Sequence, residues 1–104
     1  MPQDAYGTSN CWLTCLLVDE LEFGASSLQI CRALVRAGIE ARPTWKPMHQ
    51  QPVFSSSAIV GGGVSEDIFA RGLCLPSGSA IRSAQQGRVI DAVLKCRQSG
   101  GGVT

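Results

Sequence analysis

The hydrophobic pattern of the chain begins with an element that we expect to be a strand. Residues 11–18 form an apolar run that only Thr14 interrupts. A run of this length is typical of a strand buried on both faces. Residues 19–25, which include Gly24, lack this pattern and are expected to form a connection.

The pattern then changes to the period of a helix. Ser26 and Gln29 match a capping box, in which each side chain bonds the other residue's backbone N–H. Gly38 stands where a helix commonly ends. The expected inward face of this helix consists of Leu28, Cys31, Leu34 and Val35. Residues 39–42 are expected to form a short strand.

No hydrophobic period is visible across residues 43–63, which we expect to form a long loop. Such a run inside a compact domain is usually functional or disordered. Ser65 is expected to cap a short helix that ends at Gly72. Glu66 and Asp67 would lie in its first turn, where acidic side chains favour the helix dipole.

The remaining pattern predicts a strand, a turn and a helix. Residues 73–75 are expected to form a strand that Pro76 stops, followed by a turn. Residues 83–97 are expected to form the last helix, and its inward positions are Val89, Ile90, Val93 and Leu94. This order of elements predicts an α/β two-layer small domain, in which about three strands pack against helices.

The domain boundaries follow from the same pattern. We expect residues 1–9 to be a flexible lead-in, residues 10–97 to be the folded domain, and residues 98–104 to be a disordered tail. A chain of 104 residues is of a common size for one domain.

Composition excludes several classes of partner. Nine basic residues against eight acidic ones give a net charge of +1, which is not the electrostatic pattern of a nucleic-acid-binding protein. The apolar run at residues 12–18 is too short to span a bilayer. The first residues lack the pattern of a signal peptide. We therefore expect a cytoplasmic protein with no nucleic-acid or membrane partner.

The cysteines do not form a recognisable metal motif. Five are present, with no CxxC spacing, at positions 11, 15, 31, 74 and 96. Reduced, mostly buried thiols are the expected state. Zinc needs a tetrahedral ligand set, which Cys11, Cys15 and the distant His49 would supply poorly, so no metal site is expected.

The most distinctive chemistry lies in residues 42–49, Arg-Pro-Thr-Trp-Lys-Pro-Met-His. Proline donates no N–H and favours extended geometry in the residue before it, which excludes a helix or a central strand. A shaped loop that carries Trp45, Lys46 and His49 usually presents these groups to a ligand or partner.

These residues also carry a resemblance to a known family. Residues 38–54 and 64–79 resemble, in order and spacing, two blocks of the C-terminal domain of DegT/DnrJ/StrS-type sugar aminotransferases. Residues 10–14 resemble the strand that opens this domain, and residues 88–90 fall in its last helix. Members are pyridoxal-phosphate enzymes of fold type I that act on nucleotide-linked keto-sugars.

The resemblance implies a C-terminal domain fragment that is inactive alone. In the family, a large N-terminal domain holds pyridoxal phosphate and the lysine that binds it. This chain has only Lys46 and Lys95, so we expect no cofactor and no catalytic residue on it. Its partners would be the missing large domain or further copies of itself, and a nucleotide-sugar in the intact enzyme. The alternative is a freestanding non-catalytic binding or oligomerisation module derived from that domain.

The resemblance also implies the substrate-binding residues, each of which has a second interpretation. His49 would bind a phosphate or hydroxyl, or be held by the loop backbone. Trp45 would stack on a substrate ring, or fill the interface between domains. Lys46 would pair with a phosphate, or be solvated. Gln51 is a sugar-hydroxyl partner on family grounds alone.

The chain departs from the family pattern at three places. Cys11 replaces an arginine in the opening strand, and Gln50 replaces a leucine after the loop histidine. Residues 82–87 lack the capping threonine and the acidic residues that usually begin the last helix.

Overall fold

The computed structural model describes residues 5–100, and it has one small sheet with helices packed against one of its faces. The expected α/β two-layer class is confirmed. The elements are β1 (Thr14–Leu17), α1 (Glu20–Phe23), α2 (Ser27–Arg36), β2 (Arg42–Pro43), the 3-10 turns η1 (Met48–Gln50) and η2 (Pro52–Phe54), α3 (Gly63–Arg71), β3 (Gly72–Leu75) and α4 (Ser83–Gly100).

The sheet is antiparallel, with strand order β1-β3-β2. β3 is therefore the central strand, although it is the last in sequence. Thr14 pairs with Leu75 at one end of the β1–β3 ladder, and Leu17 pairs with Gly72 at the other. Pro43 lies in the edge strand β2, where its missing N–H removes no hydrogen bond from the interior of the sheet.

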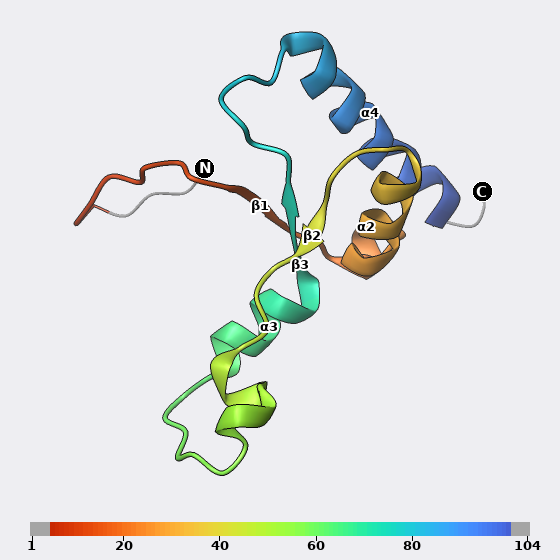
Figure 1. The fold of residues 1–104 in the computed structure, drawn as a ribbon. Coiled ribbons are helices and arrows are strands. Elements are labelled where there is room, and N and C mark those ends of the chain that lie inside the picture. The colour runs from red at the N-terminus through yellow and green to blue at the C-terminus, as the bar shows by residue number, and fades with distance from the viewer. Residues whose placement is uncertain (1–4, 101–104) are drawn as a thin grey trace.

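Helices α2 and α4 pack against each other and cover one face of the sheet (Figure 1). Figure 1 also shows α3 and the long loop projecting from the opposite end of the sheet. The core lies under α2 and α4, and its fully buried large side chains are Ile30, Leu34 and Leu73. The molecule consequently has a packed half and an open half.

The local signals for α2 are confirmed. Ser26 Oγ accepts from Gln29 N at 3.2 Å, and Gln29 Oε1 accepts from Ser26 N at 2.8 Å, which completes the capping box. Gly38 follows the helix with φ +77°, a conformation that favours glycine.

The expected inward faces of both long helices were wrong in part. Leu28 and Val35 on α2, and Ile90 and Leu94 on α4, are 51–57% exposed. Cys31 and Leu34 on α2, and Val89 on α4, are buried as expected. The buried face of α2 also includes Ser27 and Ile30, and that of α4 also includes Cys96. At 100° per residue, the misassigned positions lie roughly 100° or more from the centre of each buried face.

The first strand is shorter and more exposed than expected. β1 starts at Thr14, and Trp12 before it is 68% exposed. Among the described residues, helices cover one face of the sheet, so β1 alternates between partly buried and exposed positions rather than being buried on both faces. The prediction of mostly buried thiols was also wrong, because Cys31 and Cys96 are buried but Cys11 and Cys15 are exposed.

The expected connection at residues 19–25 was wrong in part, because it contains the short helix α1, capped by Asp19. Three further boundaries also differ from expectation. β2 occupies Arg42–Pro43 rather than residues 39–42, because the chain meets β3 only after Ala41 enters the core. α3 begins at Gly63, so Ser65 lies inside the helix and does not cap it. α4 continues to Gly100, and the rest of the predicted tail, like residues 1–4 of the lead-in, lies outside the described residues.

Candidate functional site

The candidate site is the loop between β2 and α3, and its base is tied to α3 and β3. The buried hydroxyl of Thr44 donates to the carbonyl of Ile68 at 2.8 Å. A Cβ on Gly72 would lie 2.6 Å from the Thr44 side chain. Glycine at this position therefore lets the loop pass directly against the end of α3. Pro47 is buried as well, so both ends of the segment 44–47 are fixed.

His49 lies between Gly62 and Glu66. Its side chain is 19% exposed, and Nε2 is 3.6 Å from Glu66 Oε1. A Cβ on Gly62 would lie 2.8 Å from His49 Cε1, and Gly62 has φ +103°. The ring is thus held against the glycine backbone that leads into α3, with a carboxylate beside one of its nitrogens.

Glu66 receives a second side chain of the same turn. Gln50 Nε2 donates to Glu66 Oε1 at 2.9 Å. Glu66 also lies in the first turn of α3, where the helix dipole favours a negative charge. A carboxylate placed beside a histidine orients the ring, whose N–H can donate to an anionic or hydroxyl group.

The other two predicted substrate residues lie on the same segment. Gln51 is half-buried and its amide donates to the Lys46 carbonyl at 3.2 Å, which closes the turn. The Lys46 side chain is exposed. The structure therefore places Trp45, Lys46, His49 and Gln51 on one ordered loop. It brings His49 to Glu66, and Gln51 to the backbone of Lys46.

Trp45 contacts the segment that precedes β1. Its ring centroid is 5.8 Å from that of Trp12, with the two planes inclined by 30°. Both rings stay largely exposed, at 61% and 68%. The carbonyl of Trp12 accepts from Ser77 Oγ at 3.4 Å, which links the pair to the turn after β3. Trp45 therefore belongs to an exposed aromatic pair.

Three contributors to this site were not identified from the sequence. Trp12 was expected in a buried strand, Glu66 was expected only to favour the helix dipole, and Gly62 fell in the long loop. The triple glycine at residues 61–63 was the available signal, since glycine is needed where φ is positive or a ring lies close to the backbone.

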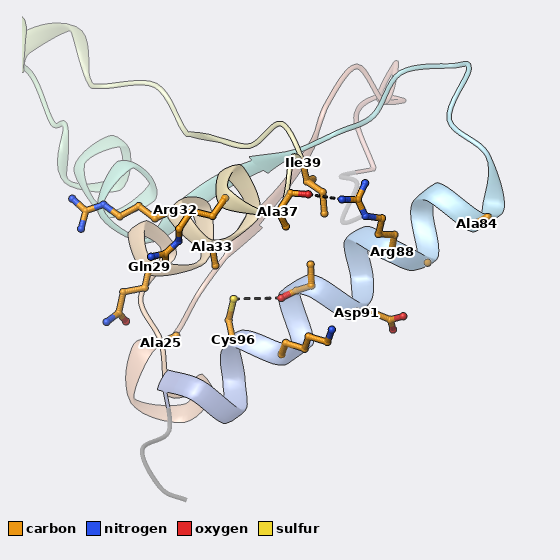
Figure 2. Close-up of a pocket in the computed structure, with 14 residues that line it drawn as sticks. Ala25, Gln29, Arg32, Ala33, Ala37, Ile39, Ala84, Arg88, Asp91 and Cys96 are labelled. Atoms are coloured by element: carbon orange, nitrogen blue, oxygen red, sulfur yellow. Dashed lines mark hydrogen bonds between the residues drawn. The ribbon is translucent and has the colours of Figure 1, made fainter.

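A large hollow lies elsewhere, between α2 and α4 (Figure 2). This groove has a volume of about 880 Å³ and is floored by small side chains, which leave the space between the helices. Its charged lining residues are Arg32, Arg36, Arg88, Asp91 and Lys95. Figure 2 shows Arg88 reaching from α4 to donate to the carbonyl of Ala37.

The groove does not contain the chemistry expected of the loop. None of the four predicted substrate residues lines it. Cys96 lies at its wall and donates to the Ala92 carbonyl at 3.3 Å. Burial raises the pKa of the Cys96 thiol, which keeps it protonated and unreactive.

The chain's lysines do not fit a pyridoxal-phosphate site. A cofactor-binding lysine has its amine held in a pocket with groups that lower its pKa. Lys46 is exposed on the loop, and Lys95 is exposed at the rim of the groove. The described residues place neither amine in an enclosed site.

The class of protein follows from a family match. Residues 1–94 match the model of the DegT/DnrJ/EryC1/StrS aminotransferase family, so the chain belongs to this family. The resemblance found in the sequence is confirmed, and the family's chemistry is pyridoxal-phosphate-dependent amino transfer.

A particular relative supports the same assignment. The chain is 47% identical over 98 residues to the Bacillus subtilis (strain 168) protein named "Putative pyridoxal phosphate-dependent aminotransferase EpsN". The match covers 90% of this chain but 24% of that relative. The chain thus spans about a quarter of the length of the relative it matches. Within residues 5–100, no helix is both long and apolar enough to cross a membrane.

Proposed function

We propose that this chain is the C-terminal domain of an aminotransferase that transfers an amino group to a nucleotide-linked keto-sugar. In this proposal, Trp45, Lys46, His49 and Gln51 face the substrate, and the rest of the enzyme supplies the catalytic lysine. The observation that carries the proposal is the placement of His49, held between Gly62 and Glu66 in a chain of this family. An ordered histidine beside an exposed lysine suits a phosphorylated or hydroxylated ligand.

The cofactor belongs to the other part of the enzyme in this proposal. Pyridoxal phosphate, when bound, supplies the electron sink for amino transfer. Lys46 and Lys95 are exposed, which supports the expectation that the chain alone binds no cofactor and is inactive. The role of the described loop is then to bind and orient the sugar nucleotide.

The partner in this proposal is the large aminotransferase domain. Apolar side chains are exposed on the open half of the molecule, around the loop and α3; they are Trp45, Met48, Val53, Ile59, Val60, Val64 and Ile68. Exposed apolar patches usually mark interaction surfaces. The radius of gyration, 15.8 Å, exceeds the ~13 Å typical of a compact domain of about 100 residues. Both observations favour a domain that is covered in the intact enzyme, and they favour self-association of the isolated chain.

A domain graft tests the proposal. This chain would replace the matching quarter of EpsN, and amino transfer to a panel of nucleotide-linked keto-sugars would be measured. The expected result is an active hybrid in which His49→Gln and Lys46→Gln raise KM. Lys95→Gln removes the same charge from the groove rim and serves as the matched control. A hybrid that folds and binds cofactor but whose KM is unchanged by His49→Gln and Lys46→Gln would contradict the assignment of this loop.

A second experiment tests the isolated chain. It is incubated with pyridoxal phosphate, reduced with borohydride, and examined by mass spectrometry for covalent attachment. No stoichiometric adduct is expected on Lys46 or Lys95. Sedimentation at increasing concentration is expected to show self-association. A monomer at all concentrations would favour the alternative, a freestanding module with no missing domain. The cytoplasmic location stays a prediction.

A further inference from the structure

Cys15 and Cys74 lie directly opposite each other on neighbouring strands. They are Cα partners in the antiparallel β1–β3 ladder. Their sulfur atoms are 3.5 Å apart. Side chains that are directly opposite in such a ladder lie on the same face of the sheet and contact each other. The two thiols are therefore brought together by strand register, across 59 residues of sequence.

The pair lies on the face of the sheet that α2 and α4 do not cover. The next ladder pair, Leu16 with Leu73, points to the core, so its neighbours Cys15 and Cys74 point the other way. Cys15 is exposed and Cys74 is half-buried. A small molecule can therefore reach Cys15 directly from solvent.

The other groups around the pair leave the thiols free to react with each other. Arg42 on β2 is the Cα partner of Cys74, but its guanidinium is 3.3 Å from the Glu40 carboxylate. Burial, together with the neighbouring Cys15, raises the pKa of Cys74 to about 11. Cys74 thus keeps its proton at neutral pH, and Cys15 is the thiol that meets an oxidant first.

The remaining cysteines are not comparably placed. Cys31 and Cys96 are buried in the core, where oxidants have little access. Cys11 is exposed, but its sulfur is 3.9 Å from the carbonyl of Ser9, and the described residues offer it no sulfur partner. Cys15, by contrast, is exposed and also has the sulfur of Cys74 at 3.5 Å.

We propose that Cys15 and Cys74 form a reversible disulfide between β1 and β3 by exchange with a small-molecule disulfide such as oxidised glutathione. The Cys15 thiolate attacks one glutathione sulfur, which forms a mixed disulfide and releases one glutathione thiol. Cys74 then gives up its proton to water as its sulfur attacks the Cys15 sulfur, which forms the cross-strand bond and releases the second glutathione as a thiol. Two protein thiols are oxidised and one glutathione disulfide is reduced to two thiols, which take up the two protons that the protein thiols lose.

Bond formation requires little rearrangement and has a defined effect. The sulfur atoms must move from 3.5 Å to about 2.05 Å, while the strands already hold the two residues opposite each other. The bond fixes β1 on the central strand. Trp12 lies just before β1 and contacts Trp45, so the oxidised form would also restrict the aromatic pair of the candidate site. This modification goes beyond the proposed function and does not depend on it.

The test uses the full chain in glutathione buffers of increasing oxidised fraction. Free thiols are blocked with N-ethylmaleimide, and the products are mapped by mass spectrometry after proteolysis without reductant. The expected product is a peptide pair linked through Cys15 and Cys74, which dithiothreitol reverses. The oxidised chain is also expected to unfold at a temperature at least several degrees higher.

Three variants make the test specific. Cys15→Ser changes an exposed side chain and should abolish the linked pair, and Cys74→Ala should do the same. Cys11→Ser alters the other exposed thiol and should leave the linked pair intact. The inference is overturned if the wild-type chain yields only glutathione adducts or bonds through Cys11. If Cys74→Ala does not fold, Cys15→Ser decides the result.

Discussion

A Cβ on Gly62 would lie 2.8 Å from Cε1 of the His49 imidazole, so the backbone at Gly62 forms the surface on which the ring lies. The same residue has φ +103°, which an L side chain adopts only with strain. The backbone conformation favours glycine here, and any larger residue would also have to displace the His49 ring. The ring's other neighbour, Glu66, is at 3.6 Å and lies on the helix that begins directly after Gly62.

Gly62→Ala is expected to displace His49 and to destabilise the chain by about 1–2 kcal/mol. The imidazole resonances in NMR spectra report the displacement directly, because His49 is the sole histidine. Gly61→Ala is the matched control, since it has φ +73° but open space around the added methyl. Gly61→Ala should destabilise the chain through backbone strain while leaving the His49 resonances unchanged. Unchanged resonances in Gly62→Ala would refute the contact.

Trp12 and Trp45 are expected to stabilise the fold jointly. The contact brings their centroids to 5.8 Å, and aromatic pairs of this kind contribute about 0.5–1.5 kcal/mol. Since both rings are largely exposed, the coupling energy between Trp12→Leu and Trp45→Leu should fall near the lower end, about 0.5 kcal/mol. Urea unfolding of the double-mutant cycle measures it. Tyr6→Leu, which changes a residue that is 91% exposed, is the control. If the effects of Trp12→Leu and Trp45→Leu simply add, the contact between the two rings does not stabilise the fold.

Gly87→Ala is expected to stabilise the chain by about 1 kcal/mol. Gly87 lies inside α4, and an added Cβ would meet nothing within 4 Å. The gain comes from the lower entropy of alanine in the unfolded chain. Gly38→Ala is the matched control, because its φ of +77° makes the same substitution destabilising. Thermal unfolding of both variants should give shifts of opposite sign.

Asp67 and Arg71 are expected to make stability depend on acid pH. The hydrogen bonds from Arg71, at 2.7 and 2.9 Å, lower the pKa of Asp67 in the folded chain. A carboxyl group whose pKa is lowered by folding stabilises the folded chain at pH values above its unfolded-state pKa, about 3.9. This stability is lost as the pH falls through the folded-state pKa. The difference in unfolding free energy between wild type and Asp67→Asn should therefore shrink below about pH 4. Arg71→Gln should show the same dependence on pH. A difference in unfolding free energy that stays constant with pH would show that the Asp67–Arg71 pair does not cause the pH dependence.

Most of the element order could be predicted because its signals are local, although the short helix α1 was missed within residues 19–25. The capping box at Ser26 and Gln29, the stop at Gly38 and the strand before Pro76 each depend on a few neighbouring residues. The loop residues from Trp45 to Gln51 were also placed together correctly, since they are close in sequence. Their assignment as substrate residues came from family resemblance and remains a prediction.

The wrong predictions concern which face of a helix or strand is buried and which residues it contacts. The hydrophobic period of α4 predicted four inward positions. Val89 and Val93 do face the core, but Ile90 and Leu94 are exposed, and Cys96 is buried in their place. A hydrophobic period identifies a helix, while the neighbouring elements decide which arc of it is covered. The same limitation explains why Trp12 was assigned to a buried strand although one face of the sheet is open.

The sequence by itself determined the class of fold, most of the order of the elements and the family, because short-range hydrogen bonding and residue order carry that information. The tertiary structure alone decided that β3 is central, that Cys15 lies opposite Cys74, and that His49 lies between Gly62 and Glu66. Each of these depends on strand register or helix phase, which is set by packing between segments far apart in the chain. No local pattern contains that information, because the free energy that selects it comes from contacts formed only when the whole domain folds.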